Sequence, residues 1–291
     1  MDRLRVRIKD KRICGLVKAF LKSGVMTAHG DREETLTGTP QGGILSPLLA
    51  NIALSVLDDV FAEHHAAHMA TSRQRQARKK QGLANWRLIR YCDDFVVMVT
   101  GNRQHAEELC GWAATVLAKL GLRLSPEKTQ VVHIDEGFDF LGFHIRRMRK
   151  RGTQKQYVYT APSKKSIQSI KDKVRAKTYR STLQSSLREL LISLNQTLRG
   201  WANYFRYGVS KDVFGAVDSY AWRRIASWLA RKHSRLSRQQ MRRRFCQPGT
   251  WKIAHDGIAF TGASSVVVTR YRYRGHHILS PWTPAPAALT G

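Results

Sequence analysis

Residues 88–99 read LIRYCDDFVVMV and place two adjacent carboxylates, Asp93 and Asp94, inside an otherwise apolar run. The β-branched and aromatic residues on both sides of this polar centre predict two strands joined by a tight turn. Burying charge is costly unless something compensates it, and at the tip of a hairpin both carboxylates could reach one divalent cation. Aspartate is also common in solvated turns. The stretch alone leaves a metal site and an ordinary polar turn open.

The composition indicates a polyanionic partner. The 291 residues are 42% hydrophobic, enough for a core, and the formal net charge is +29. Nucleic acid is the first candidate partner and an anionic membrane surface the second. Four scattered cysteines without a C-x-x-C pair argue against a disulfide scaffold and a four-cysteine zinc site. With no apolar stretch of membrane-span length and no signal peptide, we expect a soluble, cytoplasmic protein.

The charge is divided unevenly along the chain. Residues 1–140 carry 20 Lys and Arg against 16 Asp and Glu, whereas residues 141–252 carry 27 against 4. This asymmetry predicts two functional regions, one that tolerates carboxylates near its site and one that grips phosphates.

The pattern around the opening stretch mixes helices and strands. Apolar spacing predicts a helix that ends near Gly24, and a second helix from Ser46 as N-cap, with Pro47 as its first residue, to about His64. Residues 64–86 are polar and basic and predict an exposed helix extension or loop. After residue 100 the sequence predicts a helix ended by Gly121.

Further along, the segment RLSPEKTQVVHI (123–134) predicts a turn leading into a strand, and FDFLGFHIRR (138–147) predicts another short strand. From residue 163 to 247 the spacing is helical, and SSVVVTRYRYRG (264–275) is β-prone. We therefore predict an α+β protein with three parts. They are residues 1–150, a helical region over residues 151–252, and a β-prone segment with a Pro/Ala-rich tail over residues 253–291.

Three other polar groups are candidates for chemistry, and each has a plainer interpretation. Asp58 and Asp59 lie in a predicted helix, where consecutive residues diverge, so we expect a surface or capping role. A histidine cluster at 64, 65 and 68 contains an i, i+4 pair, but it lacks supporting acids or cysteines, so we expect no zinc and a solvated helix end. Cys92 is interpreted as a small buried residue and not as a nucleophile.

Several blocks occur in a fixed order around the two aspartates. GTPQGGILSPLLANI (38–52) comes first, then YCDDF (91–95), LSPEKT (124–129) and FDFLGF (138–143). This series resembles reverse transcriptases, specifically those encoded by group II introns, over residues 9–247. The resemblance implies part of a reverse-transcriptase palm, an antiparallel sheet with helices, followed by an all-α thumb and maturase region.

The resemblance also implies roles for individual residues in an RNA-directed DNA polymerase. Asp93 and Asp94 would be catalytic Mg²⁺ ligands, with Asp93 the more direct one. Lys128 would lie near the triphosphate. The implied partners are intron RNA, an RNA template with a DNA primer, and dNTPs. The segment near the nucleotide and template would be Pro40, Gln41, Gly42 and Gly43, and the primer grip Phe140, Leu141 and Gly142.

The basic second half supports the narrower family. LRGWANYFRYG (198–208) and FGAVDSYAWRRIASWLARKH (214–233) resemble the thumb and maturase region, often called domain X. Such a helical bundle suits RNA binding. Aromatic residues 201, 204 and 205 could be core residues or stacking platforms. The candidate phosphate contacts are Arg199, Arg206, Arg223, Arg224, Arg231 and Lys232.

The N-terminus departs from the family pattern. Palm polymerases need a third carboxylate from an earlier strand, and neither Asp2 nor Asp10 lies in that context. We expect an N-terminally truncated member without the fingers and first palm block, and poor primer extension by the isolated chain. Met1 would then be an internal start, a gene-prediction choice or the start of a decayed reading frame, and no endonuclease domain is expected.

The sequence leaves two functions open. One is the RNA-directed DNA polymerase with a maturase region, and the other is a non-enzymatic maturase that binds intron RNA. A basic membrane-surface protein is disfavoured because there is no strong amphipathic anchor. The sequence does not indicate an oligomeric state.

Overall fold

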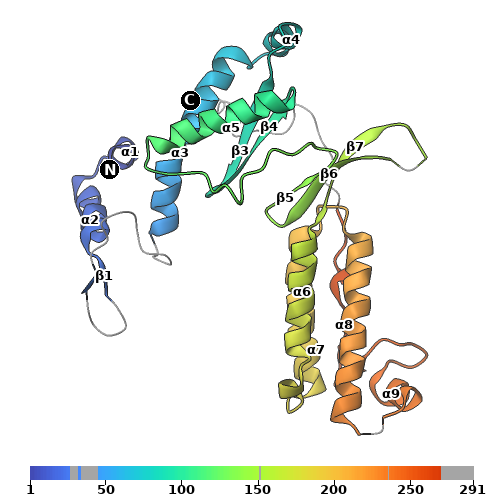
Figure 1. Ribbon diagram of the computed structural model, residues 1–291. Coiled ribbons are helices and arrows are strands. Elements are labelled where there is room, and N and C mark those ends of the chain that lie inside the picture. The colour runs from blue at the N-terminus through green and yellow to red at the C-terminus, as the bar shows by residue number, and fades with distance from the viewer. Residues whose placement is uncertain (27–31, 34–44, 151, 235, 270–291) are drawn as a thin grey trace, which may run out of the picture. The chain divides into compact units, whose positions relative to one another are not determined.

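A computed structural model describes residues 1–26, 32–33, 45–150, 152–234 and 236–269 (Figure 1). The fold combines helices with small antiparallel sheets. The chain divides into two compact units between Val131 and Val132. This division comes earlier than the boundary at residue 150 predicted from the pattern of strands and helices, because the strands after residue 138 belong to the same unit as the helices that follow them.

The first unit begins with two short helices, α1 (Asp2–Arg7) and α2 (Lys11–Lys22). The Asp10 carboxylate caps α2 by accepting a hydrogen bond from the Arg12 amide at 2.7 Å. Gly24 follows α2 with a φ of 70°, so the predicted stop is confirmed. Two short strands, β1 (Val25–Met26) and β2 (Arg32–Glu33), then pair in antiparallel fashion.

The next helix, α3 (Ser46–His68), is longer than predicted. Its N-cap is Leu45, so Ser46 is already helical and the prediction that Ser46 caps the helix was wrong. The polar stretch that follows contains α4 (Ser72–Lys80), which begins with a capping box between Thr71 and Gln74. A helix extension was therefore the correct alternative for much of residues 64–86.

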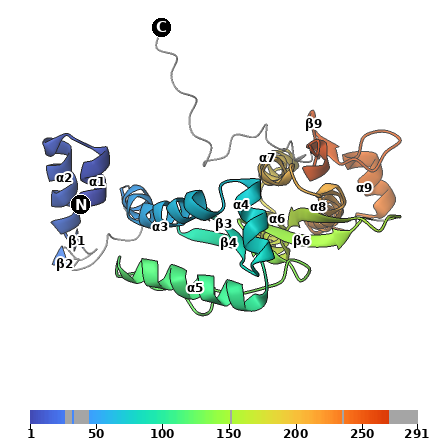
Figure 2. The ribbon, with the colours of Figure 1, turned by 90° about the horizontal axis from the view of Figure 1, so that it is seen from above.

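The opening stretch forms the hairpin that its pattern predicted. Strand β3 (Asn85–Tyr91) pairs antiparallel with β4 (Asp94–Thr100), and Tyr91 lies opposite Asp94. Helix α5 (Arg103–Ala118) follows, and Gly121, with a φ of 72°, lies just beyond its end as predicted. In Figure 2 the hairpin is seen beside α3 and α5. Their shared core contains Leu57, Phe61, Trp86, Leu88, Ala113, Val116 and Leu117.

The second unit opens with a three-stranded antiparallel sheet. Its strands are β5 (Phe138–Phe140), β6 (Phe143–Arg149) and β7 (Gln156–Pro162), in that order. The prediction of a strand within residues 123–134 was wrong, since this segment forms only turns and extended chain. Among the described residues no strand forms a ladder with this segment, and β6 contributes only one backbone bond to it, from the Arg147 amide to the Ile134 carbonyl at 2.9 Å.

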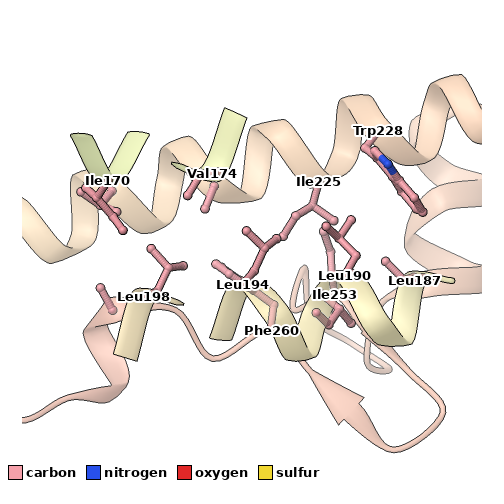
Figure 3. Close-up of a cluster of buried hydrophobic side chains, with 14 of the residues drawn as sticks. Ile170, Val174, Leu187, Leu190, Leu194, Leu198, Ile225, Trp228, Ile253 and Phe260 are labelled. Atoms are coloured by element: carbon pink, nitrogen blue, oxygen red, sulfur yellow. The ribbon is translucent and has the colours of Figure 1, made fainter. Parts of the chain in front are cut away.

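The predicted helical region is confirmed as α6 (Lys164–Lys177), α7 (Leu187–Phe205), α8 (Lys211–Lys232) and α9 (Arg238–Phe245), with a 3₁₀ turn η1 (Arg180–Thr182). Figure 3 shows how apolar side chains from these helices meet. Burial of this stripe is the main driving force for the unit. The fully buried members include Val174, Leu191, Leu194, Leu198, Ile225 and Trp228.

The chain beyond residue 252 belongs to this helical core as far as the structure describes it. Strands β8 (Ala254–His255) and β9 (Ile258–Ala259) and the 3₁₀ turn η2 (Ala263–Ser265) bring Ile253 and Phe260 into the core (Figure 3). The β-prone residues 264–269 form no strand, so that prediction was wrong for them, and residues 270–275 lie outside the described part.

Hydrogen bonds tie this last segment to two helices. Asn195 on α7 donates to the Ala259 carbonyl at 2.8 Å and accepts from the Thr261 amide at 2.9 Å. The Asp218 carboxylate on α8 accepts from the amides of Ala263 and Ser264 at 2.6 and 2.8 Å. Local sequence pattern could not reveal this, because the partners are 45 to 66 positions apart. Every helix in the described part is too short or too polar to span a membrane.

Candidate functional site

The two aspartates lie at the tip of the β3–β4 hairpin. Cys92 and Asp93 form the connection, and Asp94 is the first residue of β4. Cys92 has a φ of 55°, a left-handed conformation that is uncommon for a residue with a side chain. Cys92 is exposed, so the prediction of a small buried residue was wrong. Because Asp93 lies in the turn and Asp94 directly follows it, the two carboxylates are presented at the same end of the hairpin.

The exposed carboxylates fit a hard divalent cation. Within the described part of the chain, no protein donor bonds to Asp93 or Asp94, so their oxygens are available to a ligand. Mg²⁺ prefers oxygen ligands and is commonly held by one or two carboxylates together with waters and substrate phosphates. Among the described residues, no three His, Cys, Asp or Glu side chains gather into a complete metal cage. The arrangement suits an ion that is shared with a substrate.

Arg90 anchors the turn from the strand that precedes it. Its Nε donates to the two Asp58 carboxylate oxygens at 2.9 and 3.0 Å, and one of its terminal nitrogens also bonds to Asp58. The other terminal nitrogen donates to the Asn51 side-chain oxygen at 2.9 Å and to the Cys92 carbonyl at 2.6 Å. The hydrogen bond to Asp58 raises the pKa of the Arg90 guanidinium. One side chain therefore joins α3 to the aspartate-bearing turn.

The neighbouring acids on α3 diverge, as expected for consecutive helical residues. Asp58 faces Arg90 on β3, whereas Asp59 bonds to Arg3 on α1. Neither carboxylate caps a helix, so the capping alternative was wrong for this pair. Only Asp59 suits the surface alternative, because its side chain is 45% exposed against 29% for Asp58. The pairing partners are far apart in sequence, which is why the pattern alone did not reveal them.

The histidine cluster is partly built into the hydrophobic core. The His64 ring lies 4.6 Å from that of His68, 5.1 Å from Trp86 and 5.5 Å from Trp112, between ring centroids. Burial lowers the pKa of His64, with the His68 charge acting in the same direction. The prediction of a solvated helix end was therefore wrong for His64. The aromatic neighbours on β3 and α5 explain why it is partly buried.

Two other predicted contacts with the nucleotide have different outcomes. Lys128 is exposed in a turn whose backbone bond runs from the Lys128 amide to the Ser125 carbonyl at 3.1 Å. Its side chain is accessible to an anion. The candidate segment Pro40, Gln41, Gly42 and Gly43 lies outside the described residues.

The predicted primer-grip segment forms a turn between β5 and β6. Phe140 ends β5, and the turn residues Leu141 and Gly142 have φ values of 49° and 78°. The Leu141 carbonyl accepts from the Tyr204 hydroxyl at 2.8 Å, and the Gly142 carbonyl accepts from the Ser166 hydroxyl at 2.8 Å. A side chain at position 142 would come within 2.9 Å of Ser166 Oγ. The shape of this turn therefore depends on residues from α6 and α7.

The six basic candidates separate into two groups. Arg199, Arg223 and Arg231 are exposed, and so available to a polyanion. Arg224 instead donates to the Thr178 hydroxyl at 3.0 Å and its carbonyl at 3.2 Å. Lys232 donates to the Leu183 and Ser185 carbonyls at 2.7 and 2.6 Å.

Packing against the helical core also limits how far Arg206 and the three aromatic candidates are exposed. Arg206 is half-buried beside the Tyr207 ring, 5.8 Å from its centroid. Phe205 is buried, Trp201 packs against the same core, and the Tyr204 side chain is 53% exposed. Of the three rings, Tyr204 is the most accessible to a base, and its hydroxyl is already bonded to the turn before β6.

Two features of the site were missed by the sequence analysis. The anchoring role of Arg90 could have been suspected, because Arg90 continues the core-facing register of Trp86 and Leu88, where a charge needs a partner. A second basic group lies on α9, where exposed Arg242 sits 5.2 Å from the centroid of the half-exposed Trp251 ring. The run of arginines in QQMRRRF was a composition signal for it.

Family models match two successive parts of the chain. Residues 3–145 match the reverse transcriptase (RNA-dependent DNA polymerase) model. Residues 167–246 match the maturase-specific domain of group II introns. The first match contains the aspartate-bearing hairpin, and the second contains most of the helical core.

Curated relatives agree with these matches. Protein YkfC of Escherichia coli is 32% identical over 180 residues, covering 57% of this chain and 47% of that protein. The group II intron-encoded protein LtrA of Lactococcus lactis is 26% identical over 290 residues, covering 75% of this chain and 47% of that protein. An uncharacterized 91 kDa protein in the cob intron of Schizosaccharomyces pombe is 23% identical over 265 residues, covering 72% of this chain and 33% of that protein.

The chain spans about half the length of the first two of these relatives. The order of the matches along it, polymerase part first and maturase part second, is the order in which the sequence motifs occur. The chain belongs to the family of group II intron-encoded reverse transcriptases and maturases.

Proposed function

We propose that this chain contributes to RNA-directed DNA synthesis of the group II intron type and binds intron RNA through its helical unit. The observation that carries the proposal is the exposed aspartate pair at the hairpin tip, inside the part of the chain that matches reverse transcriptases. The proposed substrates are an RNA template with a DNA primer and dNTPs.

Asp93 and Asp94 are the residues that would hold Mg²⁺, with Asp93 the more direct ligand. When bound, the ion would supply charge stabilisation for the transferring phosphoryl group and align the attacking 3′-hydroxyl. The chain's own part is to keep two carboxylates exposed on a short, well-paired hairpin. Exposed Lys128 is a candidate counter-charge for the triphosphate.

The turn before β6 is the candidate primer grip. Its backbone is fixed by Tyr204 and Ser166, and a fixed turn suits the positioning of a primer end, because misplacement of a reacting group is costly in rate. Phe140 and Phe143 lie on either side of this turn.

Primer extension with Asp93→Ala tests the polymerase proposal. We expect weak Mg²⁺-dependent extension on an RNA template by the chain alone, because only two carboxylates meet at the described turn. Asp93→Ala should abolish that extension, whereas Asp59→Asn, which alters an acid away from the turn, should retain it. Extension that persists in Asp93→Ala would overturn the assignment of the carboxylates.

A non-enzymatic maturase is the second candidate function. The excess of 27 basic over 4 acidic residues across residues 141–252, together with exposed Arg199, Arg223 and Arg231, supports RNA binding without catalysis. Salt-dependent binding and assisted splicing of the cognate intron in the absence of any primer extension would favour this candidate. A flat salt response would count against a phosphate-driven interaction.

A further inference from the structure

A charged side chain, that of Arg90, lies on the core-facing side of the hairpin, three residues before Asp93. Arg90 follows Trp86 and Leu88 in the register that packs against α3 and α5, and its side chain is only 11% exposed. A buried guanidinium is retained at a cost unless its donors are satisfied. Here Asp58, Asn51 and the Cys92 carbonyl take up its donors.

The same network reaches the turn by a second route. The Asn51 side chain, whose oxygen accepts from Arg90, donates through its nitrogen to the Pro47 carbonyl at 3.1 Å and lies 3.7 Å from the Cys92 sulfur. The side chain of Cys92 is therefore contacted directly from α3, and its backbone carbonyl is bonded by Arg90 on β3, which Asn51 and Asp58 of α3 orient. Cys92 is also the residue with the left-handed φ, so the least favourable backbone angle of the turn is the one that the network contacts.

We propose that Arg90, oriented by Asp58 and Asn51, is the residue that positions the aspartate-bearing turn for its metal ion. Arg90 makes no hydrogen bond or ion pair with Asp93 or Asp94 in the described structure and acts through the Cys92 carbonyl, so it is a positioning residue. The proposal deepens the proposed function and rests on the role of the two aspartates in holding Mg²⁺. Its basis is the pairing geometry, which is independent of that role.

The geometry of the guanidinium, more than its charge, makes Arg90 suitable for holding the turn. A planar fork can bond Asp58 on one edge and the Asn51 and Cys92 oxygens on the other, whereas an ammonium group is a compact point charge with no fixed fork. Arg90→Lys therefore keeps the charge and removes the simultaneous contacts. Asp58→Asn keeps the side-chain shape and removes the charge that orients the fork.

The test uses the full chain with Mn²⁺ as the probe ion, titrated and followed by electron paramagnetic resonance. Asp93→Asn defines the signal that belongs to the turn. We expect Arg90→Lys and Asp58→Asn each to weaken Asp93-dependent Mn²⁺ binding about tenfold, the scale seen when an outer-shell partner of a metal ligand is lost. Asp59→Asn, with the same charge change one residue along α3, should bind Mn²⁺ like the wild type.

Hydrogen exchange at residues 91–94 is the second measurement, with the α5 segment 103–118 as the internal reference. Loss of the Arg90 contacts should speed hydrogen exchange at the turn in Arg90→Lys and Asp58→Asn. Exchange in α5 of these variants, and exchange throughout the Asp59→Asn protein, should match the wild type. If exchange in α5 rises as well, a general loss of folding is the cause and the positioning role is overturned.

The possible results separate the two proposals. If Arg90→Lys and Asp58→Asn both show the Mn²⁺ binding and hydrogen exchange of the wild type, the positioning role of Arg90 is overturned and the metal role of Asp93 stays intact. If the wild type shows no Asp93-dependent Mn²⁺ binding, the proposed metal role fails. The exchange data then decide whether Arg90 fixes the turn.

Discussion

The hydroxyl of Tyr204 on α7 donates a hydrogen bond of 2.8 Å to the backbone carbonyl of Leu141, 63 positions earlier in the chain. Leu141 has a left-handed φ of 49°, and the ring of Tyr204 stacks on that of Phe143, with centroids 5.5 Å apart. The turn proposed as the primer grip is therefore built in part by a helix from the part of the chain that matches the maturase-specific domain.

Replacing Tyr204 with phenylalanine should test this link. Tyr204→Phe keeps the ring and removes one hydrogen bond, so the free energy of unfolding should fall by about 0.5–1 kcal/mol. Urea unfolding followed by tryptophan fluorescence measures the change. Tyr207→Phe is the matched control, because its side chain is similarly exposed and its hydroxyl has no hydrogen bond within the described part. Equal effects of the two substitutions would contradict the link.

Two glycines of the same unit should respond to alanine with opposite signs. Gly142 has a φ of 78°, and an added Cβ would lie 2.9 Å from Ser166 Oγ, so Gly142→Ala should cost about 1–2 kcal/mol of stability. Gly200 is inside α7 with open space around the position of a Cβ, so Gly200→Ala should add about 0.5–1 kcal/mol. The denaturation midpoints of the two variants should move in opposite directions. Shifts of both midpoints in the same direction would contradict the conformational explanation.

Adjacent arginines on α8 should separate RNA binding from stability. Arg223 is exposed, so Arg223→Gln should weaken RNA binding, reduce the slope of log affinity against log salt by about 1, and leave unfolding unchanged. Arg224 bonds to Thr178, so Arg224→Gln should instead lower the free energy of unfolding by about 1–3 kcal/mol. Filter binding at several salt concentrations, together with thermal unfolding, measures both effects. An Arg224→Gln protein with the free energy of unfolding of the wild type would contradict the stabilising role of the bonds from Arg224 to Thr178.

The first unit should lose stability in mild acid through His64. Burial lowers the pKa of His64 below its ordinary 6.5, so between that value and the folded-state pKa the unfolded chain binds more protons. Stability is therefore fully present above pH 6.5 and declines as pH falls towards the lowered pKa. Thermal unfolding from pH 7.5 to 5.5 should show this decline.

His64→Phe should flatten that profile. The substitution removes the titrating ring, whose Nδ1 is buried without a hydrogen-bond partner in the described structure, and keeps an aromatic group beside Trp86 and Trp112. His65 also has a pKa lowered by burial, so a shallow slope should persist in this variant. An unchanged slope would show that His64 does not control the pH response.

The sequence by itself determined much of the local structure of this protein, and its family. Apolar spacing of 3.6 residues predicted the helical region, because one buried stripe per helix is a local property of the chain. The break in the apolar run at Asp93 and Asp94 predicted a hairpin with carboxylates at its tip, since alternation and turn propensity are also local. The ordered motifs indicated the same family as the two family models that match the chain.

Only the tertiary structure decided which polar residues are free to act on a ligand. Arg223 and Arg224 are equivalent in composition, yet one is exposed and the other is bonded to Thr178. Asp58 and Asp59 are likewise identical neighbours, and only Asp58 meets Arg90. These differences arise from pairing between segments tens of residues apart. In such pairing, burial makes a partner obligatory, and the helix axis determines which of two neighbours faces it.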